Sequence, residues 1–138
     1  MKHDDTLIVE SAPHRVGLRV EVRGVANYEN TLAYWQAMSA ELLAHPVPGL
    51  LLIDKTSGKP LLAEEWKALV EAMAGKGLEQ VRLAHVKPSG LQRIEFCQLY
   101  AIEAGIDARV FTDEGEADLW LRYGERAPLT GVITGKLR

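Results

Sequence analysis

The chain has 138 residues, of which 47% are hydrophobic and 25% are charged. This size and composition allow one buried core of ordinary domain size without support from disulfides or metals. The 16 Lys and Arg residues are outnumbered by 19 Asp and Glu residues, for a formal charge of −3, and the absence of a basic stripe excludes nucleic acid as an expected partner.

Two strands are predicted at the start of the chain. Residues 7–10 form a short apolar run that ends before Pro13, which cannot continue a sheet ladder. Residues 16–24 alternate between apolar and other residues, a pattern typical of a half-buried strand. One face carries Val16, Leu18, Val20 and Val22, and the other carries Arg19, Glu21 and Arg23. We expect the two strands to form an antiparallel hairpin.

Helices and strands alternate along the rest of the chain. Apolar spacings of three and four predict helices over residues 27–44 and 62–74, between Gly90 and Gly105, and after Thr112. Strands are predicted at residues 50–53, 81–86 and 108–111. The order β-β-α-β-α-β-α-β-α predicts an α/β fold with a mainly parallel five-stranded sheet and an antiparallel first strand. Residues 1–124 are expected to form one domain, followed by an extended C-terminal tail, 125–138.

Two loops that follow strands are candidate ligand sites. Ligands of parallel sheets usually bind beyond the carboxyl ends of the strands, where backbone N–H groups and hydroxyls can hold an anion. The candidate residues are Asp54, Thr56, Ser57 and Gly58 in the first loop, and Ser89 and Gly90 in the second. The spacing does not match a Walker motif, and solvated loops, with Ser89 as a helix cap, are the simpler interpretation.

The polar residues indicate no catalytic or metal-binding set. None of His3, His14, His45 and His85 is spaced with a second ligand as in a metal site. A structural, hydrogen-bonded role is the simpler interpretation of His85. Cys97, the single cysteine, excludes an intrachain disulfide, and its apolar neighbourhood is typical of a small buried side chain. We therefore expect no enzyme activity, no metal and no cofactor.

The sequence also predicts where the protein resides and which surface makes contacts. A lone cysteine is typical of a reducing compartment, and no apolar run approaches the ~20 residues of a membrane span. We expect a cytoplasmic protein without a membrane span. The helix over residues 27–44 has the most apolar positions, so Tyr34 and Trp35 are the first candidates for an interface, although such aromatics are more often core residues.

Three segments resemble a known family. Residues 51–54 end the central strand, residues 81–86 form the next one, and residues 109–121 combine a strand, Phe111-Thr112-Asp113, an acidic helix start and Trp120-Leu121. This arrangement is similar to STAS-like (anti-sigma-factor-antagonist-like) bacterial proteins, across roughly residues 7–123. The serine that is phosphorylated in some of these proteins has no counterpart at residues 61–64 of this chain, and the nearest hydroxyls belong to Thr56 and Ser57.

The resemblance implies a small non-enzymatic module that acts by binding. The first hypothesis is a regulatory module that contacts a protein partner or a second copy of itself as a homodimer. The alternative is a carrier or sensor of a small apolar or lipid-like ligand, held between the helices and the sheet.

Overall fold

A five-stranded sheet forms the centre of the protein in the computed structural model, which describes residues 7–90 and 94–124. The spatial order of the strands is β1-β2-β3-β4-β5. β1 pairs antiparallel with β2, and the other neighbouring strands are parallel, which confirms the predicted sheet. The strands are β1 (Ile8–His14), β2 (Gly17–Val25), β3 (Gly49–Ser57), β4 (Arg82–Val86) and β5 (Asp107–Phe111). The predicted end of the first strand before Pro13 is wrong, because β1 is an edge strand, where a proline is tolerated, and Pro13 lies opposite Leu18 of β2. The predicted C-terminal tail lies outside the described residues.

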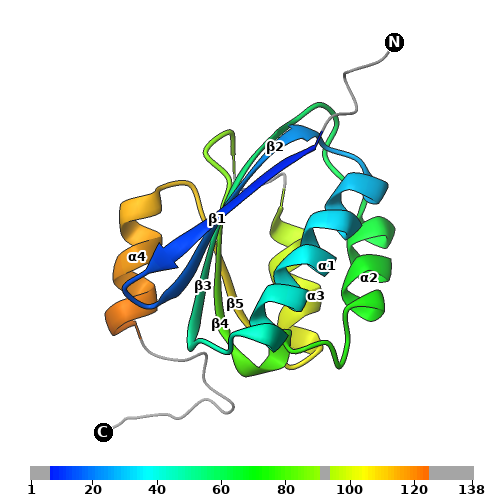
Figure 1. Ribbon diagram of the computed structural model, residues 1–138. Helices are drawn as coiled ribbons and strands as arrows, with labels where there is room; N and C mark the ends of the chain where they lie inside the picture. Colours follow the sequence, from blue (N-terminus) through cyan, green and yellow to red (C-terminus); the bar gives the residue numbers. More distant parts are fainter. Residues whose placement is uncertain (1–6, 91–93, 125–138) are drawn as a thin grey trace, which may run out of the picture.

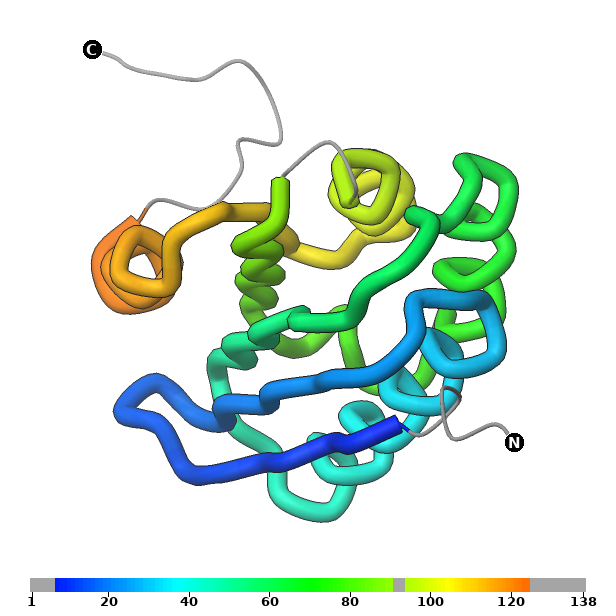
Figure 2. Tube along the Cα trace, turned by 90° about the horizontal axis from the view of Figure 1, so that it is seen from above, coloured from blue at the N-terminus to red at the C-terminus, as the bar shows by residue number. Residues whose placement is uncertain are grey.

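In the described part of the chain, four α-helices cover the sheet in two unequal layers. α1 (Tyr28–Ala44), α2 (Ala63–Ala72) and α3 (Glu95–Glu103) lie on one face, and α4 (Glu114–Tyr123) lies on the other (Figure 1). A short 3-10 helix, η2 (Leu78–Gln80), precedes β4. Figure 2 shows the same separation from above, with α4 apart from the other three helices. The observed order of helices and strands is the predicted one.

Two helix starts follow directly from side-chain caps. The Asn27 carboxamide oxygen accepts a hydrogen bond from the Asn30 backbone N–H at 2.7 Å, and the Asp113 carboxylate accepts one from Glu116 N–H at 2.8 Å. Such bonds satisfy N–H groups that have no partner within the helix. The expected cap at Ser89 is wrong, because α3 begins only at Glu95.

The central strand is covered on both faces, as its unbroken apolar run predicts. Leu50 and Leu52 belong to the core beneath α1, α2 and α3, whereas Leu51 and Ile53 belong to the smaller core beneath α4. All four side chains are at most 2% exposed. Because successive side chains of a strand point to opposite faces, one strand supplies both cores.

The same strand is longer than the sequence predicts. The pattern places its end at Asp54, but β3 continues to Ser57, which lies opposite Val25 of β2. Lys55 and Thr56 have the composition of a turn, yet their backbones pair with β2 as a parallel ladder. Asp54 and Thr56 are therefore buried strand residues rather than loop residues.

Two glycines let β2 and β3 start close together. A Cβ atom on Gly17 would lie 2.2 Å from the Gly49 carbonyl oxygen, and the Gly17 φ of +146° is one that other residues rarely adopt. Only glycine, which has no Cβ atom, tolerates both this φ and this close approach to the Gly49 carbonyl oxygen.

We expect Gly17→Ala to lower the free energy of unfolding by more than about 2 kcal/mol, because backbone strain and a clash act together. Gly105→Ala is the matched control, since Gly105 has a φ of +89° and a Cβ atom added there would meet no other atom within 4 Å. Urea unfolding of both variants measures the difference. Equal losses of unfolding free energy in the two variants would show that the close approach of Gly17 to Gly49 does not contribute to the destabilisation.

Candidate functional site

A buried polar cluster lies where β3 and β4 end. Asp54 and Thr56 come from β3, His85 comes from β4, Lys87 follows β4, and Tyr34 comes from α1; all five are buried. Leu52 lies opposite His85 in the parallel register, so alternation carries Asp54, Thr56, His85 and Lys87 onto the face that α1 covers. These five residues are called the Asp54 cluster below.

The Asp54 carboxylate is the acceptor at the centre of the cluster. Its Oδ1 accepts hydrogen bonds from the Thr56 backbone N–H at 3.1 Å, from the Thr56 hydroxyl at 2.6 Å and from Lys87 Nζ at 3.0 Å. Its Oδ2 lies 2.9 Å from His85 Nε2 and accepts a bond from the Tyr34 hydroxyl at 3.3 Å. One carboxylate thus connects two strands and a helix.

The Lys87 ammonium is also fully bonded. Besides Asp54, Nζ donates to the Thr56 carbonyl oxygen at 2.6 Å and to the Thr56 hydroxyl oxygen at 3.0 Å. An ammonium group has three donors, and these three acceptors use all of them. Lys87 therefore has no donor left for a ligand unless the cluster rearranges.

The cluster shifts the titration of two of its members. Burial raises the pKa of the Asp54 carboxyl, but the hydrogen bond and charge of His85, the charge of Lys87 and the Thr56 hydrogen bond outweigh it, so the pKa lies below the ordinary range. Burial, followed by the negative charge of Asp54, raises the pKa of the Tyr34 phenol well above its ordinary value. At neutral pH the carboxylate is ionised and the phenol is protonated.

The space beside the cluster is small. A cavity of about 10 Å³ adjoins it, which is room for about one water molecule. The Trp35 and Trp66 rings meet the His85 ring edge-on, with centroids 6.0 and 6.2 Å away. Within the described residues, His85 Nδ1 and both indole Nε1 atoms have no hydrogen-bond partner. The arrangement holds the strands together and can bind a water molecule.

The six predicted loop residues are not brought together. Asp54 and Thr56 belong to the buried cluster, whereas Ser57, Gly58 and Ser89 are exposed. Gly90 is partly buried in a turn, where its N–H donates to the Lys87 carbonyl oxygen at 3.1 Å. The meeting of Lys87 and Tyr34 at Asp54 was not predicted from the sequence. The one signal that could have indicated this site is the continuation of β3 beyond Asp54 to Ser57.

The predicted interface residues are core residues. Tyr34 and Trp35 are 1% and 2% exposed, and both pack in the core beneath α1. The apolar stripe of α1 faces the sheet because that is where it can be buried, so these two side chains offer no contact area at the surface. His85 has the expected hydrogen-bonded role, with Asp54 as its partner.

Outside the Asp54 cluster, the candidates for chemistry in the described part of the chain are the thiol and the possible metal ligands. Burial raises the pKa of the Cys97 thiol, so this buried side chain stays protonated at neutral pH. Residues 7–90 and 94–124 contain no group of three or more His, Cys, Asp or Glu side chains placed to hold a metal ion. They also contain no helix with the length and hydropathy needed to cross a membrane.

The chain matches no model in a scan of protein families, and no curated protein matches it in a sequence search.

We expect Asp54→Asn to lower the free energy of unfolding by about 3 kcal/mol at pH 7, because it leaves the buried Lys87 charge without its counter-ion. The folded-state pKa of Asp54 is lowered, so its contribution is complete above the unfolded pKa of about 3.9 and is lost as the pH falls through the folded value. The difference between wild type and variant should therefore shrink in acid. Urea unfolding between neutral and acid pH measures it.

Lys87→Met and the double variant Asp54→Asn/Lys87→Met complete the test. The double variant should lose less stability than the sum of the two single losses, because neither partner is then left charged alone. Additive losses, or a difference that does not change with pH, would contradict the ion pair as the source of stability.

Proposed function

We propose that this protein is a non-enzymatic, STAS-like binding or regulatory module that acts through protein–protein contact. The observation that carries this proposal is an apolar stripe on the outer side of α3. Phe96, Leu99 and Ile102 recur at every third position and are 44%, 50% and 43% exposed. This spacing places the three side chains along one side of the helix. These residues are called the α3 stripe below.

The exposure of the stripe contrasts with the inner side of the same helix. Cys97 and Ala101 are 2% and 1% exposed and pack in the core together with Ile94. α3 is therefore apolar on both its inner and its outer side. A surface helix usually carries polar residues outside, and a run of large exposed apolar side chains is typical of a binding surface.

The closed Asp54 cluster supports a role in binding rather than in catalysis. Its carboxylate and ammonium groups are bonded to each other and to Thr56, and the adjoining cavity of about 10 Å³ has no room for a substrate. General acid–base chemistry needs a group that can reach a substrate proton. The cluster instead stabilises the sheet behind the helices.

The proposal is tested by Phe96→Ser/Leu99→Ser, which removes two of the three side chains of the α3 stripe without adding charge. Affinity capture from cells of the source organism should recover a protein with the wild type that is lost with this variant, because interface anchors are large apolar side chains. Leu119→Ser on α4 is the matched control, since Leu119 is 52% exposed. Quantitative mass spectrometry of the captured proteins is the readout. Identical captures for all three proteins would refute the proposal.

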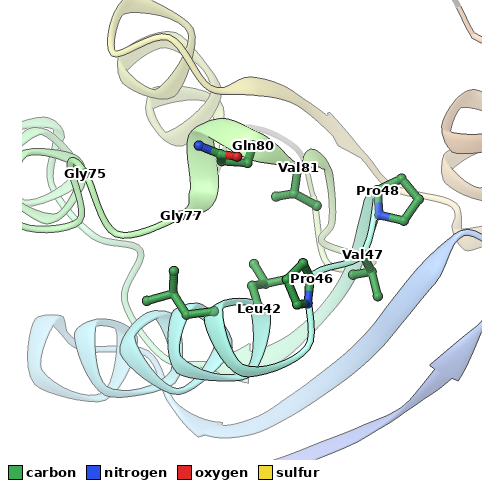
Figure 3. Close-up of a pocket in the computed structure, with 9 residues that line it drawn as sticks. Leu42, Pro46, Val47, Pro48, Gly75, Gly77, Gln80 and Val81 are labelled. Atoms are coloured by element: carbon green, nitrogen blue, oxygen red, sulfur yellow. The ribbon is translucent and has the colours of Figure 1, made fainter.

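A second candidate function is the carriage of a small apolar ligand, and one hollow favours it. It has a volume of about 530 Å³, within the range of small-molecule sites, and lies between the end of α1 and the segments that precede β3 and β4 (Figure 3). The lining has no charged side chain and consists of Leu42, Leu43, Pro46, Val47, Pro48, Gly75, Gly77, Gln80 and Val81. This hollow is far larger than the space beside the Asp54 cluster.

Native mass spectrometry of freshly purified protein tests this second function. A carrier should retain an uncharged small molecule of constant mass, and Leu43→Arg should abolish its retention by placing a charge at the rim of the hollow. Leu43 is 62% exposed, so the substitution leaves the core intact. Leu119→Arg is the control. Protein without a bound mass would contradict the carrier function.

A further inference from the structure

The helix that carries the α3 stripe and its neighbour α2 are both acidic. α2 and α3 pack against each other on the same face of the sheet (Figure 1). Together they contain five carboxylates and a single basic residue, Lys67. The carboxylates belong to Glu64, Glu65, Glu71, Glu95 and Glu103. Since the whole chain has a formal charge of only −3, the negative charge is concentrated on these two helices.

A groove between the two helices combines apolar and acidic groups. It has a volume of about 220 Å³ and is lined by Val70, Ala74, Tyr100 and Ala104, with Lys67, Glu71 and Glu103 also contributing. Tyr100 stacks on Phe96 of the α3 stripe, with ring centroids 6.3 Å apart, so the groove and the stripe are continuous. The groove is large enough for a single long side chain.

The two carboxylates of the groove differ in their partners. Glu71 Oε2 lies 3.1 Å from Lys67 Nζ, one helical turn away on α2. Among the described residues, none forms a hydrogen bond or an ion pair with the Glu103 carboxylate, and the same is true of Glu95 at the other end of α3. The α3 stripe is therefore bounded at both ends by acids that have no bonded cation among the described residues. The hydrogen bond to Glu71 and, at longer range, the Glu103 charge raise the pKa of Lys67 in the groove.

We infer that the partner of the α3 stripe is a cationic, apolar protein segment, whose apolar side chains contact Phe96 and Leu99 and whose Lys or Arg side chains bind Glu95 and Glu103. This inference rests on the proposed function, and it specifies the chemistry of the partner. Lys and Arg have long apolar stems that can cover Val70 and Tyr100 in the groove while their charged ends reach Glu103.

The same charges disfavour a second copy of this chain as the occupant. If two α3 helices met along their stripes in antiparallel orientation, Glu95 of one copy would approach Glu103 of the other. In parallel orientation, Glu95 and Glu103 of one copy would approach Glu95 and Glu103 of the other copy. Both arrangements bring like charges together, which destabilises a complex. An anionic membrane surface or a nucleic acid would be repelled in the same way.

Peptide selection tests the inference with the full-length protein. A library of random peptides on phage is selected on the wild type and counter-selected on Phe96→Ser/Leu99→Ser, which leaves the acids in place. The surviving peptides should be enriched in Lys and Arg as well as in apolar residues. The affinity of one such peptide should fall by about tenfold for Glu95→Gln/Glu103→Gln, as expected for two exposed charge pairs. Fluorescence anisotropy gives the affinities.

A matched variant separates this effect from a general change in charge. Glu29→Gln/Glu41→Gln removes two exposed carboxylates from α1 and should leave the peptide affinity unchanged. The wild-type affinity should also decrease with added salt more steeply than that of Glu95→Gln/Glu103→Gln, because salt screens exposed charges. Equal losses for the two double variants would contradict a specific role of Glu95 and Glu103.

The remaining outcomes distinguish the two proposals. Peptides that require the α3 stripe but show no enrichment in Lys and Arg would overturn the cationic partner and leave the binding module intact. No peptide that discriminates between wild type and Phe96→Ser/Leu99→Ser would overturn both. A dimer in analytical ultracentrifugation that Phe96→Ser/Leu99→Ser dissociates would identify a second copy as the occupant, which would also overturn the cationic partner.

Discussion

The buried charge of Asp54 is the constraint on which the carboxyl edge of the sheet depends. An ionised carboxylate away from water is costly unless cations and hydrogen-bond donors surround it. Here Lys87 and His85 provide the cation and the ring nitrogen, at 3.0 and 2.9 Å. β3 and β4 must therefore end in register, and α1 must lie close enough for Tyr34 to reach the same carboxylate at 3.3 Å.

This constraint closes the interior at the carboxyl edge of the sheet. The edge of a parallel sheet where ligands commonly bind is here filled by side chains that bond to one another. The features that remain open lie elsewhere, on the outer side of α3, in the groove next to it and in the hollow at the opposite edge of the sheet. The exposed apolar side of α3, flanked by Glu95 and Glu103, is the observation on which the proposed binding role rests.

The Asp54 cluster was beyond prediction from the sequence for a specific reason. Asp54 contacts residues that lie 31 and 33 positions away, and no local pattern connects them. The segment after Ile53 is polar and contains glycine, which is typical of a turn, but pairing with β2 holds it as a strand to Ser57. Once the strand is extended, the alternation of side chains places Asp54 and Thr56 on the inner face.

The sequence by itself determined the order of the elements, the antiparallel first strand and the double burial of β3, because these depend on apolar periodicity and chain order. The tertiary structure alone decided which apolar side chains are exposed. Tyr34 and Trp35 on α1 are buried, whereas Phe96 and Leu99 on α3 are not. A helix that is apolar on two sides gives no periodic signal for which side faces the sheet, and only packing against the neighbouring elements selects it.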